Sequence, residues 1–292
     1  MTASPFDLSH PAAYHAWRDS KLAAHPARVE DLVVEVGDVA ALTDSEHAAL
    51  LDRVRRCNMA VYAERRGRPG REDKEALRAL GLRFGLRSLD HNNLADDDGI
   101  TPLAVSRDGT RARYIPYTDR PIAWHTDGYY NDAAHQVRGL LLHCARPAAQ
   151  GGDNRLMDIE ALYILLRDED PTHISALMRP DAMTIPGNEE EGMVRAATVG
   201  PVFYIEDGSL RMRYTARGRN IEWSPDAEVQ AAVAAIRRIL SGPSPFIFQA
   251  RLEAGMGLVS NNVLHTREPF TDDPERPRLL YRARYHDRIA GS

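Results

Sequence analysis

The stretch of residues 123–130, which reads as the end of a β-strand, constrains both the fold and the chemistry of this chain. His125 and Asp127 stand two residues apart within it. Residues i and i+2 of a strand point to the same side, so these side chains can offer a nitrogen and an oxygen to one metal ion. The other interpretation is a histidine with a local hydrogen-bond partner at a strand end. Two ligands do not complete a metal site, so a third has to come from elsewhere in the chain.

The best candidate for the third ligand is His265, at the end of a predicted strand over residues 258–265. Two histidines and one carboxylate on one face of an ion, with the other positions open, form the ligand set of non-haem Fe(II) oxygenases. A satisfied core histidine is the alternative for His265. If the metal interpretation holds, two β segments far apart in the sequence must lie side by side.

The rest of the chain fits a fold that is mainly β with flanking helices (α+β). Asp108-Gly109 and Asp207-Gly208 predict hairpin turns. Helices are expected from Thr43, whose spacing to Glu46 predicts a capping box, around 77–84, within 158–180 and from Pro225 to Gly242. Strands are expected at 32–36, 59–62, 103–105, 122–125, 139–144, 201–205, 210–214, 246–252, 258–265 and 279–285.

No internal repeat or convincing linker divides the sequence, so we expect one domain over residues 1–292. Residues 1–32 are expected to form an N-terminal arm or short helix on the surface. Residues 158–242 read as a partly helical insertion. The need to bring residues 125 and 265 together favours one barrel or sandwich with helices packed outside it.

Composition narrows the partners and the location. The formal net charge is −5, and the chain is 43% hydrophobic and 27% charged. This balance gives no electrostatic reason to expect nucleic acid as a partner. Cys57 and Cys144 lack metal-site spacing, and no apolar run approaches a membrane span or a signal peptide. We therefore expect a cytoplasmic protein without a membrane partner. The sequence leaves the oligomeric state open, and a homo-oligomer is one option.

Arginines gather on one face of the predicted C-terminal strand. Alternation puts Arg278, Arg282 and Arg284 on one side of the strand and Leu279 to Tyr285, at odd positions, on the other. A buried arginine needs an anion, and its planar fork suits a carboxylate. An interior ion pair is the alternative for Arg278, and an ordinary exposed edge strand is the alternative for Arg282 and Arg284.

Taken together, His125-x-Asp127, the Gly151-Gly152 turn, the distal His265 and the arginine after it resemble the Fe(II)/2-oxoglutarate-dependent dioxygenases. The chain is most similar to the taurine dioxygenase and clavaminate synthase-like superfamily, from about residue 84 to residue 286. The resemblance implies a double-stranded β-helix (jelly roll) core with helical insertions. It also implies that His125, Asp127 and His265 bind Fe(II) and that O₂ and 2-oxoglutarate are consumed.

The resemblance assigns further roles residue by residue. Arg278 would grip the distal carboxylate of 2-oxoglutarate, and Arg282 stands where relatives often have a second arginine for the cosubstrate or an anionic substrate. Asn154 takes the place of a threonine that often touches 2-oxoglutarate. The expected substrate residues are His91, Asn92, Asn93, Tyr129, Tyr130 and Arg284, although a structural role is the competing interpretation for the loop residues and the tyrosines.

The function that follows is hydroxylation, or another oxidation at a C–H bond, of a small molecule with release of succinate and CO₂. Arg111, Arg113, Tyr114 and Tyr117 precede the metal motif and favour an anionic or zwitterionic substrate. Desaturation or cyclisation at the same site stays open. The alternative is a jelly-roll binding or regulatory protein that keeps a metal without turnover. A metal hydrolase on a β-barrel is a third option, but it would not need the arginine face.

Overall fold

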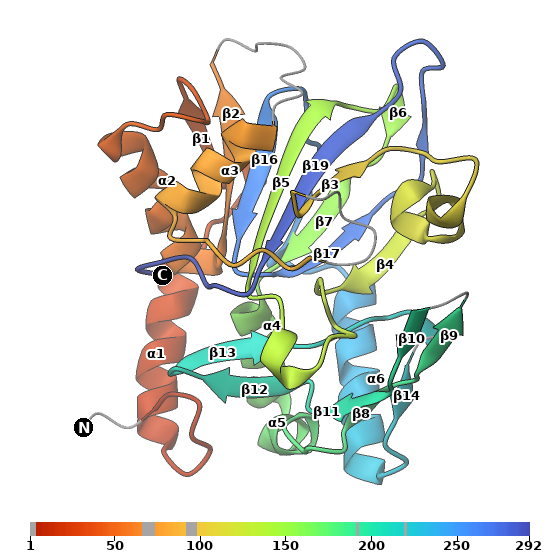
Figure 1. Cartoon of the computed structure of the whole chain (residues 1–292). Coiled ribbons are helices and arrows are strands. Elements are labelled where there is room, and N and C mark those ends of the chain that lie inside the picture. Colours follow the sequence, from red (N-terminus) through yellow and green to blue (C-terminus); the bar gives the residue numbers. More distant parts are fainter. Residues whose placement is uncertain (1–3, 66–73, 92–97, 191–192, 219–220) are drawn as a thin grey trace.

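Two β-sheets packed face to face form the centre of the computed structural model, which describes residues 4–65, 74–91, 98–190, 193–218 and 221–292 (Figure 1). In the larger sheet the first two strands pair in parallel and the other pairs are antiparallel. Its strands in spatial order are β1 (Val33–Val36), β2 (Met59–Glu64), β16 (Met256–Ser260), β5 (Gly139–Arg146), β19 (Leu279–Tyr285) and β3 (Ile100–Leu103).

The smaller sheet is antiparallel and carries most of the predicted metal motif. Its strands in spatial order are β15 (Ile247–Ala250), β7 (Asn154–Met157), β17 (Leu264–Arg267) and β4 (Ile122–His125). Leu142 and Leu258 of the larger sheet share one buried core with Leu156 and Phe248 of the smaller sheet. The arrangement is the expected double-stranded β-helix, so the predicted fold class is confirmed.

Two helices cover the outer face of the larger sheet. Helix α2 (Asp44–Cys57) begins with the predicted capping box: the Thr43 hydroxyl accepts from the Glu46 N–H, and the Glu46 carboxylate accepts from the Thr43 N–H. Helix α3 (Lys74–Arg83) follows later in the chain. Leucines from both helices pack on the odd-numbered residues of β19, as the alternation in the sequence predicts.

A second layer of helices lies below the sheets in Figure 1 and surrounds a separate core. It consists of α1 (Pro11–Ala24), α4 (Ile159–Glu169), α5 (Pro171–Leu177) and α6 (Ala227–Ser241). Residues 1–32 therefore include a helix of 14 residues. Its Lys21 is buried and forms ion pairs with Asp158, at 2.9 Å, and with Glu160 at the start of α4.

Short strands and 3₁₀ turns complete the described chain. The strands are β6 (Gln150–Gly151), β8 (Met183–Ile185), β9 (Asn188–Glu190), β10 (Met193–Arg195), β11 (Thr198–Gly200), β12 (Phe203–Glu206), β13 (Ser209–Met212), β14 (Glu222–Trp223) and β18 (Phe270–Thr271). The 3₁₀ turns are Val29–Leu32, Thr110–Arg113, Ile115–Tyr117 and Ala133–His135. No helix among the described residues is long and apolar enough to cross a membrane.

Three local predictions are wrong. Residues 258–265 are not one strand, because β16 ends at Ser260 in the larger sheet and β17 begins at Leu264 in the smaller one. Asp108-Gly109 leads into a 3₁₀ turn, since β3 pairs with β19 instead of a following strand. Pro225 lies outside α6, whose N-cap is Asp226. Asp207-Gly208, in contrast, does form a hairpin turn between β12 and β13, with positive φ at both residues.

Candidate active site

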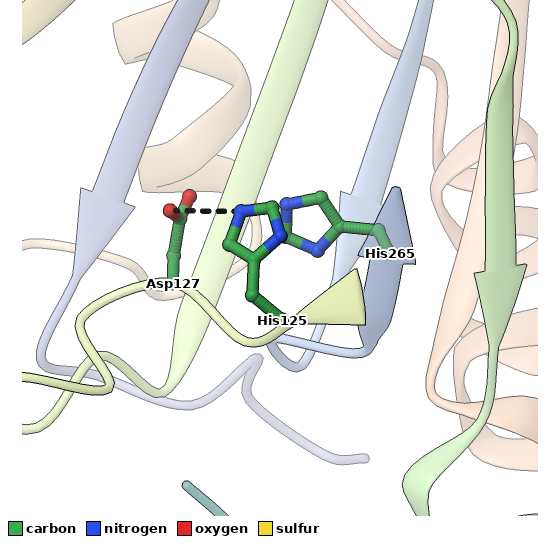
Figure 2. Close-up of side chains that lie close together, drawn as sticks. All are labelled: His125, Asp127 and His265. Carbon is green, nitrogen blue, oxygen red and sulfur yellow. Dashed lines mark ion pairs between the residues drawn. The ribbon is translucent and has the colours of Figure 1, made fainter. Parts of the chain in front are cut away.

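The three predicted metal ligands meet where β4 and β17 lie side by side (Figure 2). His125 and His265 are register partners in these strands, and their ring centroids are 4.2 Å apart. Asp127 follows two residues after His125, with one carboxylate oxygen 3.9 Å from His125 Nε2. One ligand atom from each residue lies within 4.8 Å of the others. This spacing lets one ion bind all three side chains.

Backbone hydrogen bonds orient both imidazoles. His125 Nδ1 donates to the Ala123 carbonyl at 2.9 Å, and His265 Nδ1 donates to the Val263 carbonyl at 3.0 Å. A proton fixed on Nδ1 leaves Nε2 as the free lone pair, which is the tautomer a metal ligand requires. Burial, together with the neighbouring His265, lowers the pKa of His125 to about 3, and burial also lowers the pKa of His265. Both rings are therefore neutral and ready to bind a cation.

Asp127 is held in its charged form. Burial by itself would raise the pKa of this carboxyl. The positive charges of Arg282 and then Arg284 lower it by more, so the net pKa lies below its ordinary value. Arg282 on β19 donates from one terminal nitrogen to both Asp127 oxygens, at 3.1 and 3.4 Å. The arginine expected for an anion thus lies directly against the proposed metal ligand.

Arg278 directly precedes β19, four residues before Arg282. It is 5% exposed, and its guanidinium lies 4.9 Å from the centre of the Phe270 ring. Within the described part of the chain, no side-chain hydrogen bond or ion pair reaches this guanidinium, and burial lowers its pKa. Arg267 differs: it lies 5.0 Å from the same ring, but its guanidinium donates to backbone carbonyls of Pro116, Thr118 and Arg120. A buried guanidinium left without a partner fits a site for a ligand carboxylate.

The Gly-Gly turn next to Arg278 requires its glycines. Gly151 has φ +72°, and a Cβ there would lie 2.4 Å from the Pro269 carbonyl oxygen. A Cβ on Gly152 would lie 3.6 Å from Arg278 Nε, which is an ordinary contact. Asn154 follows at the start of β7, is buried, and donates its side-chain amide to the Thr266 carbonyl at 2.8 Å. That amide donor is therefore used within the protein, next to His265 in β17.

Two of the expected substrate residues, Arg284 and Tyr130, contact each other, and Arg284 also lowers the pKa of Asp127. Arg284 is buried, donates to the Tyr130 hydroxyl at 2.9 Å and pairs with Asp90 at 2.5 Å. Its guanidinium also lies 5.9 Å from the centre of the Tyr130 ring. Tyr129 points into the helical core, so its side chain packs with apolar residues. His91 is exposed, and Asn92 and Asn93 lie outside the described residues.

Sequence reasoning missed three residues at this site. Asp90 was not singled out, although it neutralises Arg284. Arg195 of the short strand β10 lies 5.7 Å from the centre of the Tyr130 ring. Asn262 hydrogen-bonds to the backbone of Asp127. The pair Asn261-Asn262 just before His265 was a usable signal. Two adjacent asparagines in an otherwise apolar strand pattern indicate a turn whose amides hydrogen-bond to neighbouring backbone.

The comparisons with known proteins agree with this geometry. The family model described as "Taurine catabolism dioxygenase TauD, TfdA family" matches residues 37–284. A uridine-5'-phosphate dioxygenase from Streptomyces sp is 36% identical over 199 residues, covering 64% of this chain and 70% of the relative. A protein of the same name from Amycolatopsis sp is 32% identical over 173 residues, covering 56% and 60%.

The fold also matches a solved structure. The non-haem iron oxygenase OrfP, crystallised with Fe and α-ketoglutaric acid, superposes with a TM-score of 0.60 at 17% identity over 85% of this chain and 81% of that one. At 17% identity, this match shows a shared fold. The family match spans most of the chain, so the protein belongs to the TauD/TfdA dioxygenase family and is an enzyme of the type that uses iron and 2-oxoglutarate.

Proposed function

We propose that this enzyme binds Fe(II) through His125, Asp127 and His265 and oxidises a C–H bond of a small anionic substrate. The leading substrate class is a nucleoside 5'-phosphate, because two relatives are named uridine-5'-phosphate dioxygenase. With O₂ and 2-oxoglutarate, the bound metal supplies the oxidation: one oxygen atom enters succinate as CO₂ leaves, and the other enters the product. Hydroxylation is the simplest outcome of that stoichiometry.

The observation that carries the substrate proposal is the surplus of positive charge beside the metal ligands. In the described chain, Arg282 pairs with the Asp127 carboxylate, and a metal bound to that carboxylate would take it from Arg282. Arg282 and Arg284 of β19 both lower the pKa of Asp127, so two guanidiniums act on this one carboxylate. Asp90 pairs with Arg284, so Arg282 is the cation left for an anionic substrate once a metal binds Asp127. A phosphate monoester carries the charge that this surplus would balance.

The chain's own residues divide the remaining work. Arg278 would bind the distal carboxylate of 2-oxoglutarate bidentately. Asn154 would shape the same end of the site through its bond to Thr266. Arg282 would hold the substrate anion, and the Arg284–Tyr130 contact would form the neighbouring wall. These groups would fix the substrate's C–H bond near the metal, which is the positioning that such an oxidation requires.

Succinate release tests the proposal. The purified enzyme with Fe(II), 2-oxoglutarate and O₂ would be offered uridine 5'-phosphate, uridine, L-arginine and L-asparagine. We expect uridine 5'-phosphate to stimulate succinate formation and uridine to do so far less, because it lacks the phosphate. Stimulation by either amino acid with none by the nucleotide would reject the substrate class and leave the cofactor assignment intact.

An Arg282→Lys variant sharpens the test. Lysine keeps the charge but loses the planar fork, so we expect the KM for the nucleotide to rise about 10-fold or more, in line with a charged hydrogen bond. The KM for 2-oxoglutarate should change much less. An equal rise in both KM values would assign Arg282 to the cosubstrate instead.

The remaining expectations about surroundings stay predictions. A small-molecule partner agrees with the names of the relatives. A cytoplasmic location, the lack of nucleic-acid and membrane partners, and a single domain over residues 1–292 rest on the sequence argument. Size-exclusion chromatography with light scattering would determine the oligomeric state.

A further inference from the structure

The turn between β16 and β17 holds an asparagine in an unusual backbone conformation. Asn262 has φ +52°, in the left-handed region, which asparagine tolerates better than most residues. It stands where the chain leaves the larger sheet and enters the smaller one, three residues before His265. It is 6% exposed, so its amide has to find partners inside the protein.

Those partners belong to the loop that carries Asp127. The Asn262 Oδ1 accepts from the Asp127 N–H at 2.8 Å. Its Nδ2 donates to the Asp127 carbonyl at 2.9 Å and to the Val137 carbonyl at 2.8 Å. One side chain thus bonds both backbone polar groups of Asp127, as a neighbouring strand would.

Asp127 lies outside the paired strands, so hydrogen bonds from Asn262 take the place of β-ladder bonds to its backbone. His125 and His265 lie in paired strands, so the β-ladder sets their positions. Asp127 lies beyond the end of β4, followed by Gly128 at φ +67°. A Cβ on Gly128 would come within 2.5 Å of the Val137 side chain, so the loop packs tightly against the residue that Asn262 also holds. Asn262 therefore ties the Asp127 backbone to both the β16–β17 turn and Val137.

We propose that Asn262 is a positioning residue that fixes the carboxylate ligand relative to the two histidines and thereby sets the affinity of the iron site. This inference rests on the proposed ligand set His125, Asp127 and His265. Groups that orient metal ligands typically change metal affinity about 10–100-fold when they are removed. Asn262 touches no ligand atom itself, so its effect passes through the Asp127 backbone.

The adjacent residue provides a matched control. Asn261 is also a buried asparagine, at 3% exposure. Its amide bonds to Asn58, Ser292 and the Ile289 N–H, away from the metal loop. A change at Asn261 should therefore report the general cost of disturbing this turn, without a direct effect on Asp127.

The experiment compares Asn262→Gly, Asn262→Asp and Asn261→Asp with the wild-type enzyme. Glycine keeps the left-handed backbone and removes the amide. Aspartate keeps one acceptor and replaces both donated bonds with repulsion. The dissociation constants for Fe(II) and Co(II) would be measured anaerobically by calorimetry, together with the visible absorption of the Fe(II)–2-oxoglutarate complex and the melting temperature of the metal-free protein.

We expect both Asn262 variants to bind metal about 10–100-fold more weakly and to show an altered absorption band. We expect Asn261→Asp to retain wild-type metal affinity even if its melting temperature falls as far. Folded Asn262 variants with wild-type affinity and spectrum would overturn the proposal. So would an equal loss of affinity in Asn261→Asp at equal loss of stability. A wild-type protein that binds no Fe(II) would instead overturn the proposed function beneath it.

Discussion

Two clusters of buried polar groups in this protein are satisfied in different ways. The Lys21 cluster consists of Lys21, Asn58, Asp158 and Glu160. Lys21 pairs with both carboxylates, and Asn58 donates to Asp158 at 2.9 Å. Burial lowers the pKa of Lys21, but the two carboxylates raise it more, so the net pKa lies above its ordinary value. Lys21 and the two carboxylates that share it thus have ionic partners inside the protein.

The metal-site cluster, formed by His125, Asp127, His265 and Arg282, is not closed in that way. Two free Nε2 lone pairs face one another beside a carboxylate, and Arg278 nearby has a buried guanidinium with no side-chain partner in the described chain. Buried lone pairs and charges without partners cost free energy unless something else satisfies them. Polar groups that satisfy one another therefore indicate a structural cluster, whereas buried polar groups without partners indicate a ligand site.

The largest expected effect separates the two clusters by activity. Asp127→Ala removes one of three proposed metal ligands, so 2-oxoglutarate turnover should fall to below about one-thousandth of the wild-type rate. The melting temperature of the metal-free protein should also fall, because the change breaks the buried Asp127–Arg282 ion pair. Succinate release and thermal unfolding measure the two quantities. Retained turnover would remove Asp127 from the ligand set.

A loss of stability without a loss of metal binding is expected for Asp158→Asn. This change leaves Lys21 buried beside a neutral group, and breaking a buried pair in this way typically costs about 3–5 kcal/mol of unfolding free energy. Fe(II) affinity should stay at the wild-type level. Denaturant unfolding and metal titration test both parts, and a large loss of metal affinity would show that the clusters are not separate.

The same pair predicts a pH dependence. Burial raises the pKa of Asp158, but Lys21 lowers it more, so the folded-state pKa lies below the unfolded value of about 3.9. A carboxyl of this kind stabilises the fold at pH values above its unfolded pKa, and this contribution is lost as the pH falls through the folded pKa. The difference in unfolding free energy between wild type and Asp158→Asn should therefore be constant near neutral pH and shrink below about pH 4. A difference that grows in acid would contradict the paired state.

A smaller effect is expected from Arg278→Ala. Loss of a charged, two-pronged hydrogen bond should weaken 2-oxoglutarate binding about 10–100-fold, while Fe(II) affinity is preserved. Arg278→Lys is the control, since it keeps the charge and should recover part of the affinity. Calorimetry with 2-oxoglutarate and Mn(II) measures the change. Wild-type binding by the alanine variant would place the cosubstrate elsewhere.

The smallest effect is expected from Asn154→Ala. Loss of the bond to the Thr266 carbonyl should cost about 1 kcal/mol of unfolding free energy. The KM for 2-oxoglutarate should rise less than in Arg278→Ala, because the amide donor of Asn154 is already used by the protein. A larger rise would make Asn154 the main cosubstrate anchor.

Features that depend on local periodicity were predictable from the sequence. The alternation in 278–285 placed the arginines on the interior face of β19, and Thr43 with Glu46 marked the start of α2. The proximity of the three proposed ligands was also predictable, since a strand end fixes His125 relative to Asp127, and the family order of motifs pointed to His265.

Features set by tertiary pairing were not predictable in the same way. The sequence of residues 258–265 predicts one strand, but the chain changes sheets at Asn261-Asn262, and these two amides are the one local sign of a turn. The partner of Arg284 is Asp90, from a segment with no motif of its own. Long-range pairs of this kind leave no period in the sequence, so a single chain does not reveal them.

The aromatic neighbour of Arg278 has a consequence for reading other members of this family. Phe270 offers that arginine a ring face, which attracts a cation without neutralising it. An acidic side chain at this position would pair with the guanidinium permanently and compete with the diacid for it. A homologue with an intact iron triad but a glutamate in place of Phe270 is therefore expected to have lost its dependence on 2-oxoglutarate, which would make this one position a marker for degenerate paralogues.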